Sequence, residues 1–324
     1  MTELRFRFRR LRGSERLRAL VRETSLAPSQ LILPVFVEEG AKRAVPIPSM
    51  PGVVRHTEAG LGEVVARARD LGIGAVMLFG VSQHKDACGS DTWNPEGLMA
   101  RMIRGARHAA PDMLVISDNC FCEYTDHGHC GVVEGDRVLN DPTVTNLVRQ
   151  VLTAAHAGVD MIAPSGMMDG MIAAIRAGLD GAGFSHLPVM SYSTKFASAF
   201  YGPFRDAVDS SFKGNRAAYQ LDAANAREAL AESLRDEEEG ADILMVKPGL
   251  AYLDVLAAIR AHCARPLAVY QVSGEYAMIK AAAAAGLMDE RALVMETMTA
   301  FRRAGADMIL SYFAEDVARW LHRG

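Results

Sequence analysis

Two lysines in this sequence stand at the ends of apolar, strand-like runs. Lys247 directly follows the run 243–246, and Pro248 prevents a central strand from continuing beyond it. Lys195 ends a second run, which begins at residue 189. A lysine at an arbitrary position is usually a solvated surface charge, but two lysines that end two buried strands are typical of amines that attack carbonyl groups. The first chemistry that the sequence indicates is therefore covalent catalysis by lysine.

A nucleophilic lysine must be unprotonated, whereas an isolated lysine has a pKa of ~10.4. Two ammonium groups ~6 Å apart at an effective dielectric constant of ~20 repel by about 3 kcal/mol, which lowers the pKa of one of them by about 2. Burial must supply the remaining decrease. Candidate walls that exclude water are the aromatic residues Phe79, Phe204 and Tyr270, although each also suits an ordinary core position.

Three of the five cysteines lie within eleven residues, as Cys120, Cys122 and Cys130. If the first two lie in extended backbone, their sulfurs point to one side. Three thiolates without a fourth fit a catalytic zinc site with one open position, and sulfur as a soft ligand favours zinc. A structural zinc site closed by His127 or His129 is the alternative that the spacing leaves open.

Other polar residues stand at strand ends or in the loop after the Lys195 run. Arg205 and Arg216 lie in that loop, and a guanidinium group can grip a carboxylate through two hydrogen bonds. Gln220 is a weaker candidate in the same stretch. The strand-end candidates are one acid and three hydroxyl residues: Asp118, Ser165, Ser273 and Tyr312. If the strands are parallel members of one barrel, their carboxyl ends meet at one face. Two lysines, an acid and several hydroxyl groups gathered at that face indicate an active site.

Strands that alternate with helices must position these residues. The strand-like runs are continuously apolar, as expected for strands covered on both faces, and they span 31–37, 75–79, 114–117, 161–163, 189–193, 243–246, 267–272 and 308–313. Between them lie amphipathic segments such as 61–71, 144–157, 169–179 and 292–304. This alternation predicts a (β/α)8 TIM barrel over residues 31–324. An open doubly wound sheet is the alternative, but no Gly-x-Gly-x-x-Gly follows the first strand.

The boundaries of one helix can be predicted closely. Asn225 and Glu228 have the spacing of a capping box at its start. Leu230 and Leu234 mark its apolar face, and Gly240 is placed to end it.

Composition excludes several classes of function. The chain has 324 residues, half of them hydrophobic, and 35 Lys and Arg against 39 Asp and Glu, so no basic excess indicates nucleic-acid binding. No apolar run is long enough to cross a membrane, and the first residues lack the apolar core of a secretion signal. Five cysteines, three of them clustered, favour a metal or reactive site in a reducing cytoplasm over a disulfide framework.

Residues 1–30 are expected to form a polar arm that precedes the barrel. The segment from Arg5 to Arg22 is rich in arginine, which is also compatible with a transit peptide or with nucleic-acid contact. Glu15 interrupts this positive charge and Glu23 follows it, so a polar arm is the preferred interpretation.

Two long motifs resemble a known enzyme family. Residues 240–252, GADILMVKPGLAY, resemble the sequence around the Schiff-base lysine of the δ-aminolevulinic acid dehydratase, or porphobilinogen synthase, family. Residues 191–205, SYSTKFASAFYGPFR, resemble its second lysine segment. The resemblance extends from about residue 31 to the C-terminus. It implies an enzyme of heme biosynthesis that condenses two 5-aminolevulinate molecules to porphobilinogen with loss of two waters.

The resemblance also implies roles for the candidate residues. Lys247 would form a Schiff base with the first substrate and Lys195 with the second. The residues that would bind the two substrate carboxylates are Arg205 and Arg216 for one, Ser273 and Tyr312 for the other, with Gln220 as a weaker candidate. Asp118 and Ser165 would serve proton transfer or its positioning.

The metals and the assembly are likewise implied by resemblance. Zn²⁺ would bind Cys120, Cys122 and Cys130, as in the zinc-dependent branch of the family; other branches carry acids there. Glu232 matches a glutamate that holds an allosteric Mg²⁺ in some members, and one carboxylate plus waters is a normal magnesium site. The arm would contact a neighbouring subunit in a homo-oligomer, an octamer.

Two other functions are weighed against this reading. A class I aldolase would be a barrel with one lysine, which leaves the second lysine and the cysteines without a role. A zinc-binding interaction protein with structural cysteines leaves both strand-end lysines unexplained. Borohydride distinguishes them, because only a Schiff-base enzyme is trapped covalently on lysine with a keto substrate.

Overall fold

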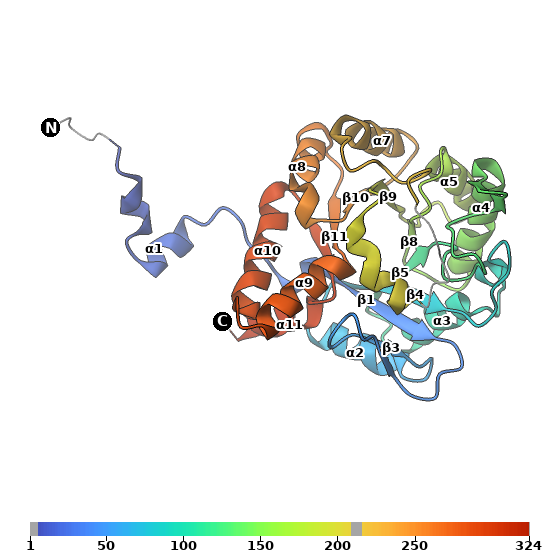
Figure 1. The fold of residues 1–324 in the computed structure, drawn as a ribbon, viewed down its shortest axis with the longest axis horizontal. Coiled ribbons are helices and arrows are strands. Elements are labelled where there is room, and N and C mark those ends of the chain that lie inside the picture. The colour runs from blue at the N-terminus through green and yellow to red at the C-terminus, as the bar shows by residue number, and fades with distance from the viewer. Residues whose placement is uncertain (1–5, 209–215, 324) are drawn as a thin grey trace.

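Eight parallel strands form a barrel in the computed structural model, which describes residues 6–208 and 216–323 (Figure 1). The barrel strands are β1 (Leu31–Glu38), β4 (Ala75–Val81), β5 (Leu114–Asn119), β8 (Met161–Pro164), β9 (Met190–Lys195), β10 (Ile243–Lys247), β11 (Leu267–Gln271) and β12 (Met308–Ser311). Hydrogen bonds join them in the order β8-β5-β4-β1-β12-β11-β10-β9. A parallel bridge between Ile162 and Val189 joins the two ends of this order. The predicted TIM barrel is therefore confirmed.

Every predicted strand lies where the continuous apolar runs placed it, and the differences are confined to the ends. β9 and β10 extend to their terminal lysines because Lys195 and Lys247 pair with each other. β12 ends at Ser311, before the predicted end, because Ala314 already begins a helix. Continuous apolar runs thus located the strands, whereas pairing with neighbours set their ends.

Helices surround the barrel (Figure 1). They are α2 (Leu61–Asp70), α3 (Leu98–Ala109), α4 (Asn140–His156), α5 (Met171–Gly181), α7 (Ala226–Glu238), α8 (Leu253–His262), α9 (Ser273–Ala284), α10 (Glu290–Ala304) and α11 (Ala314–His322). The short helix α6 (Gly202–Ala207), yellow in Figure 1, instead lies across one end of the barrel. In α10 the Asp289 side chain accepts a hydrogen bond from the Ala292 N–H at 2.7 Å, and Gly305 ends the helix with a φ of 116°. Between these caps, Val294, Met298 and Phe301 are buried with helical spacing against the strands.

The α7 helix begins and ends where predicted, directly after Asn225 and before Gly240. Gly240 adopts a φ of 107°, which favours glycine, just after the helix. The capping box was wrong: the Asn225 side chain donates to the Glu228 carboxylate at 2.8 Å instead of accepting from the helix backbone. Both residues are exposed, so water can satisfy the first N–H groups of the helix in place of a capping side chain.

Shorter elements complete the fold. Two hairpin pairs are β2 (Val45–Pro46) with β3 (Val54–His56), and β6 (Val133–Glu134) with β7 (Arg137–Val138). The 3-10 turns are η1 (Phe8–Arg12), η2 (Pro28–Gln30), η3 (Ser90–Trp93), η4 (Ala199–Tyr201) and η5 (Leu250–Tyr252). Of the described helices, none combines the length and apolar character that crossing a membrane would require.

The N-terminal segment extends away from the barrel (Figure 1). It contains η1 and the short helix α1 (Glu15–Leu20), neither of which has a buried residue. Phe6, Phe8 and Leu20 are 79%, 74% and 82% exposed. Apolar side chains with this exposure have little within the chain to cover them. Residues 1–5 of the predicted arm lie outside the described residues.

Candidate active site

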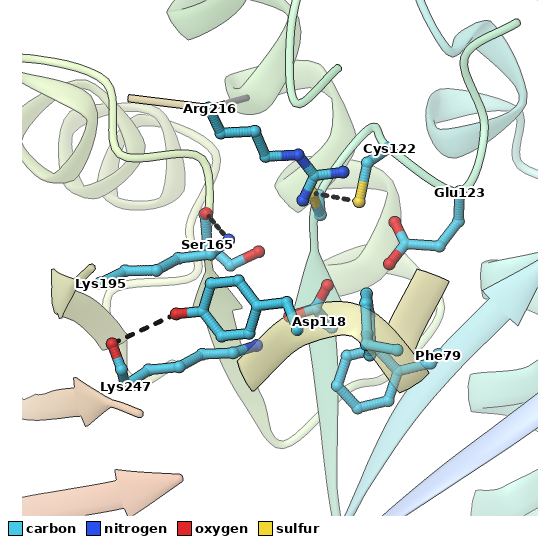
Figure 2. Close-up of a pocket in the computed structure, with 11 residues that line it drawn as sticks. Phe79, Asp118, Cys122, Glu123, Ser165, Lys195, Arg216 and Lys247 are labelled. Atoms are coloured by element: carbon cyan, nitrogen blue, oxygen red, sulfur yellow. Dashed lines mark hydrogen bonds between the residues drawn. The ribbon is translucent and has the colours of Figure 1, made fainter. Parts of the chain in front are cut away.

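Lys195 and Lys247 lie side by side at the carboxyl end of the barrel. They are paired residues of β9 and β10, and only 4% and 6% of each residue is exposed. Both line a buried cavity of about 20 Å³, which has room for about one water molecule. Figure 2 shows the two side chains extending into the same space. The predicted meeting of two lysines is therefore present in the fold.

Lys247 is surrounded by aromatic rings. Its Nζ lies 4.2 Å from the ring centroid of Tyr270, 5.0 Å from that of Tyr192 and 5.3 Å from that of Phe204. Burial, and secondarily repulsion by Lys195, lower the pKa of Lys247 to about 7. Burial has the larger effect, so the aromatic walls matter more than the second ammonium group. Tyr192 was not recognised in the sequence, where a tyrosine within an apolar run has no distinctive signal.

Lys195 has a different environment. Its Nζ donates a hydrogen bond to the Ser165 carbonyl at 2.6 Å (Figure 2). Burial lowers the pKa of Lys195, but the negative charge of the Cys130 sulfur opposes this effect, and the net pKa lies above the usual value. The two lysines are thus unequal: Lys247 is available as a neutral amine near pH 7, and Lys195 is held as an ammonium group.

Two buried carboxyl groups, Asp118 and Glu123, face the same cavity (Figure 2). Burial raises the pKa of Asp118, although the positive charge of Lys247 opposes this effect. Burial, together with repulsion by Asp118, raises the pKa of Glu123 to about 7. Among the described residues, neither oxygen of Glu123 has a hydrogen-bond partner. Sequence reasoning missed Glu123, although its position directly after Cys122 was a usable signal.

The three clustered cysteines form a group of potential metal ligands. Cys120, Cys122 and Cys130 are buried and form no disulfide, and their sulfurs lie within 4.8 Å of one another. Hydrogen bonds from the other two thiols lower the pKa of Cys130 well below its usual value. A buried set of three sulfur donors without a disulfide suits a soft divalent cation.

The histidines of the cysteine loop are placed away from these sulfurs. In the part of the chain that the structure describes, no histidine nitrogen lies with the three sulfurs in a ligand group. His127 Nε2 lies 3.1 Å from the Ala87 carbonyl, and His129 Nδ1 lies 3.4 Å from the Tyr219 hydroxyl. The geometry favours a site with three cysteines and one open position over one closed by histidine.

The two predicted arginines lie at the mouth of the lysine cavity. Arg216 lines the cavity and donates to the Gly128 carbonyl at 2.9 Å. Arg205 and Gln220 line an adjoining cavity of about 170 Å³, which shares Arg216 and Phe204 with the first. The structure thus places the two arginines at adjoining cavities, one of which both lysines line.

Ser165, Ser273 and Tyr312 are less uniformly placed. Ser165 lines the lysine cavity, whereas Ser273 and Tyr312 are not among its lining residues. The Tyr312 hydroxyl lies 3.0 Å from that of Tyr270, whose ring contacts Lys247, so Tyr312 is one side chain away from the site. Ser273 begins α9 and its hydroxyl donates to the Phe200 carbonyl at 3.4 Å. Their predicted carboxylate-binding role remains a prediction.

Glu232 lies outside this site, on α7. It lines a separate cavity of about 290 Å³ together with Asp169 and Glu228. Burial and the charges of these two acids raise the pKa of Glu232. Several acids around one cavity are compatible with a bound cation, which is the role predicted for Glu232.

Comparison with known proteins identifies the family. The sequence profile of delta-aminolevulinic acid dehydratase matches residues 5–320. The chain belongs to the δ-aminolevulinic acid dehydratase family. It is 53% identical to the delta-aminolevulinic acid dehydratase of Escherichia coli (strain K12) over 318 residues, covering 98% of each chain. It is also 53% identical to that of Helicobacter pylori (strain J99) over 322 residues, covering 98% of this chain and 99% of the relative.

A solved structure of the family is closely similar. The delta-aminolevulinic acid dehydratase of Toxoplasma gondii ME49, in complex with the reaction product porphobilinogen, has a TM-score of 0.96 and 45% identity. The match covers 99% of this chain and 92% of that chain. The family resemblance of the two lysine motifs is thereby confirmed over nearly the whole chain.

Proposed function

We propose that this protein is a porphobilinogen synthase, which condenses two molecules of 5-aminolevulinate to porphobilinogen with loss of two waters in heme biosynthesis. The observation that carries the proposal is the pair of buried lysines that end β9 and β10 in one cavity. The family relationship supports the same reaction. The chemistry of each step follows from the environment of each residue.

Lys247 is suited to the first covalent step. At neutral pH about half of its amines are neutral, because its pKa is about 7. The amine attacks the keto carbon of the first substrate and forms a carbinolamine. Loss of one water then gives an imine, in which nitrogen has replaced the keto oxygen. The surrounding rings exclude water and so protect this imine from hydrolysis.

Lys195 is suited to hold the second substrate. Its ammonium group must release a proton before it can attack a keto carbon. Of the two buried carboxyl groups in the same cavity, Asp118 is the one that interacts with the charge of Lys195 and can accept that proton. The Ser165 carbonyl fixes the amine position. The two bound substrates then lie on neighbouring strands, where their condensation is intramolecular in effect.

Binding of the substrate carboxylates is assigned to the cavity mouth. Arg205 and Arg216 hold the carboxylate of the second substrate by charge-assisted hydrogen bonds, with Gln220 beside them. Ser273 and Tyr312 bind the other carboxylate near the N-terminus of α9, whose dipole favours an anion.

Cys120, Cys122 and Cys130 would hold a zinc ion beside Lys195. When bound there, zinc supplies Lewis-acid polarisation of the second substrate. The sulfur of Cys130, whose pKa is held well below its usual value, supplies negative charge on that side of the cavity and stabilises the ammonium form of Lys195. All five cysteines are free, and the donors must stay reduced, so the cytoplasm is the compartment that we propose.

The direct test is incubation with 5-aminolevulinate and a colour reaction for a pyrrole product. Porphobilinogen formation with zinc and a thiol reductant supplied is expected. Absence of any pyrrole under these conditions would sink the proposal. Trapping of one lysine only, with an aldehyde product instead of a pyrrole, would favour the aldolase alternative.

Arginine substitutions should weaken the reaction strongly. Leaving a bound carboxylate unpaired in a dry site costs about 3–5 kcal/mol. Arg216→Ala should therefore lower kcat/KM by roughly two to nearly four orders of magnitude, and Arg205→Ala, which removes an exposed residue, by at least about tenfold. Arg227→Ala, an exposed arginine on α7, is the matched control and should change kcat/KM by less than about twofold. A loss below about threefold at Arg205 or Arg216 would place that residue outside the site.

A remote magnesium ion is assigned to Glu232 and its acidic neighbours. Glu232→Ala should remove any stimulation of turnover by magnesium while leaving the zinc-dependent activity, because the cavity of Glu232 is separate from the lysine cavity. Glu238→Ala, an exposed acid on the same helix, serves as the control. Equal stimulation of the Glu232 variant and the wild type would make Glu232 an ordinary surface acid.

The N-terminal arm, residues 1–30, is assigned to contacts with another subunit in an octamer. Its exposed apolar side chains would gain cover from a second copy of the chain. Phe8→Asp and Leu20→Asp should therefore lower the molar mass measured by light scattering. Arg16→Asp, which lies on the same arm but removes no apolar surface, is the control. An unchanged mass in both apolar variants would contradict this role.

A further inference from the structure

The two catalytic lysines stand at different numbers of residues from the start of the pairing between their strands, one even and one odd. Lys247 is four residues after Ile243, whereas Lys195 is five residues after Met190, the residue that pairs with Ile243. Successive side chains of a strand point to opposite faces. With regular alternation on both strands, one lysine would point into the barrel and the other toward the surrounding helices. Both side chains nevertheless line the inner cavity.

A β-bulge in β9 resolves this mismatch. Ser191 pairs with Leu244 and Thr194 pairs with Val246, so β9 uses three steps where β10 uses two. One extra residue on one strand reverses the facing of everything after it, and bulges next to active sites re-aim side chains in this way. The extra residue lies between Tyr192, which faces the lysines, and Lys195.

Hydroxyl groups on the outer side of the bulge bind one residue of α7. Ser193 Oγ lies 3.0 Å and Thr194 Oγ1 lies 2.6 Å from Ser233 Oγ, and Thr194 Oγ1 donates to the Ala229 carbonyl at 3.2 Å. Consecutive residues of a regular strand cannot both reach the same side chain. A hydroxyl donates one hydrogen bond, so the chain runs from Ser193 to Ser233, then to Thr194 and to the carbonyl.

This network is fully buried. Ser193, Thr194 and Ser233 are 1%, 0% and 0% exposed. A buried hydroxyl without a partner is costly, so the three groups are satisfied only when Ser193 and Thr194 both face α7. The network therefore favours the bulged register over the regular one.

We propose that Ser233 is a positioning residue, which holds the β9 bulge through Ser193 and Thr194 and thereby turns Lys195 into the active site. Ser233 touches neither lysine and acts only through the backbone of β9. The inference rests on the proposed function, because it concerns the lysine assigned to the second substrate. It adds a determinant on the outer face of the barrel to an active site inside it.

Two variants disrupt the hydroxyl network, one on α7 and one on β9. Ser233→Ala removes its centre, and Thr194→Val removes one hydroxyl at nearly constant shape. Thr194→Ser keeps that hydroxyl. Thr297→Val is a matched control, because Thr297 is a buried residue of α10 whose hydroxyl donates to the Leu293 carbonyl of its own helix.

The readout is the distribution of borohydride-trapped 5-aminolevulinate between the two lysines, measured by peptide mass spectrometry of the full chain. In Ser233→Ala and Thr194→Val, the Lys195 adduct should fall at least about tenfold relative to the Lys247 adduct, and kcat/KM should fall by about 10- to 100-fold. Thr194→Ser and Thr297→Val should keep the wild-type ratio. A merely structural residue would lower the melting temperature and both adducts together.

Wild-type ratios in Ser233→Ala and Thr194→Val, or a parallel loss of both adducts, would overturn the inference. If Ser233→Ala does not fold, Thr194→Val decides by the same criteria. A crystal structure of the folded variant is independent of catalysis: the Lys195 Nζ should leave the Ser165 carbonyl, which it contacts at 2.6 Å in the wild type. An intact contact in the variant refutes the inference, whatever the trapping experiment shows. Failure of the wild type to form any adduct would instead refute the proposed function, and the crystal structure would still test the role of Ser233.

Discussion

Lys247→Ala should abolish turnover and remove the main borohydride-trapped adduct. The amine that attacks the first keto group is then missing, and Lys195, the other lysine that lines the cavity, is held as an ammonium group. A decrease of at least about four orders of magnitude in kcat is expected, as for loss of a covalent nucleophile. Lys195→Ala should also abolish turnover but leave an adduct on Lys247. The two variants thus separate capture of the first substrate from completion of the reaction.

The pH dependence of trapping tests the same assignment. Because the pKa of Lys247 is lowered to about 7, the neutral fraction of its amine decreases tenfold for each pH unit below that value. The rate of adduct formation should therefore fall as pH decreases through about 7 and level off above it. Lys280→Ala, which removes a half-buried lysine paired with Glu290 outside the lysine cavity, is the control and should retain the wild-type profile. Full turnover in either active-site variant, or a midpoint near that of a free lysine, contradicts the two-lysine mechanism.

Removal of zinc should abolish activity without unfolding the protein. A structural zinc site contributes folding free energy, so its loss unfolds a small domain. Here the three cysteines lie on the loop after β5, beside a barrel whose apolar core is independent of them. Chelation should therefore leave the helical circular dichroism and the melting transition nearly unchanged. Zinc should restore turnover, and magnesium alone should not, because thiolates are soft ligands.

Two further measurements sharpen the zinc prediction. Oxidation of Cys120 and Cys122, whose sulfurs lie 3.2 Å apart, should mimic chelation, and a thiol reductant should reverse it. The Lys247 adduct should still form without zinc if the metal serves only the second substrate. Full activity in a demonstrably zinc-free preparation would refute the catalytic assignment. A cooperative loss of helix on chelation would instead support a structural site.

The sequence by itself determined the barrel and most of its site. Strands made of continuously apolar runs must be covered on both faces of their sheet. The alternation of eight such runs with amphipathic segments therefore favoured a TIM barrel. Because parallel strands of a barrel end at one face, Lys195 and Lys247 could be expected to meet before any coordinates were known. The cysteine spacing likewise predicted a compact group of sulfurs, which the structure contains.

Tertiary structure decided properties that depend on contacts between distant segments. The pKa of Lys247 decreases mainly through burial among Tyr192, Tyr270 and other rings, whereas the nearby Cys130 sulfur raises that of Lys195. Local sequence gives both lysines the same appearance, since each simply ends an apolar run. Glu123 stands next to Cys122 in the sequence, but the fold decides that its carboxyl group lines the same cavity as Asp118.

The facing of Lys195 shows the division most clearly. Its position in the sequence fixed its place at the end of β9, but regular alternation from Met190 would turn its side chain away from Lys247. Only the pairing of β9 with β10, together with the hydroxyl network to Ser233, fixes the bulge that turns it inward. The alternation of side chains is a property of a single strand, whereas the register between strands is set by neighbouring elements. The position of Lys195 in the active site depends on both.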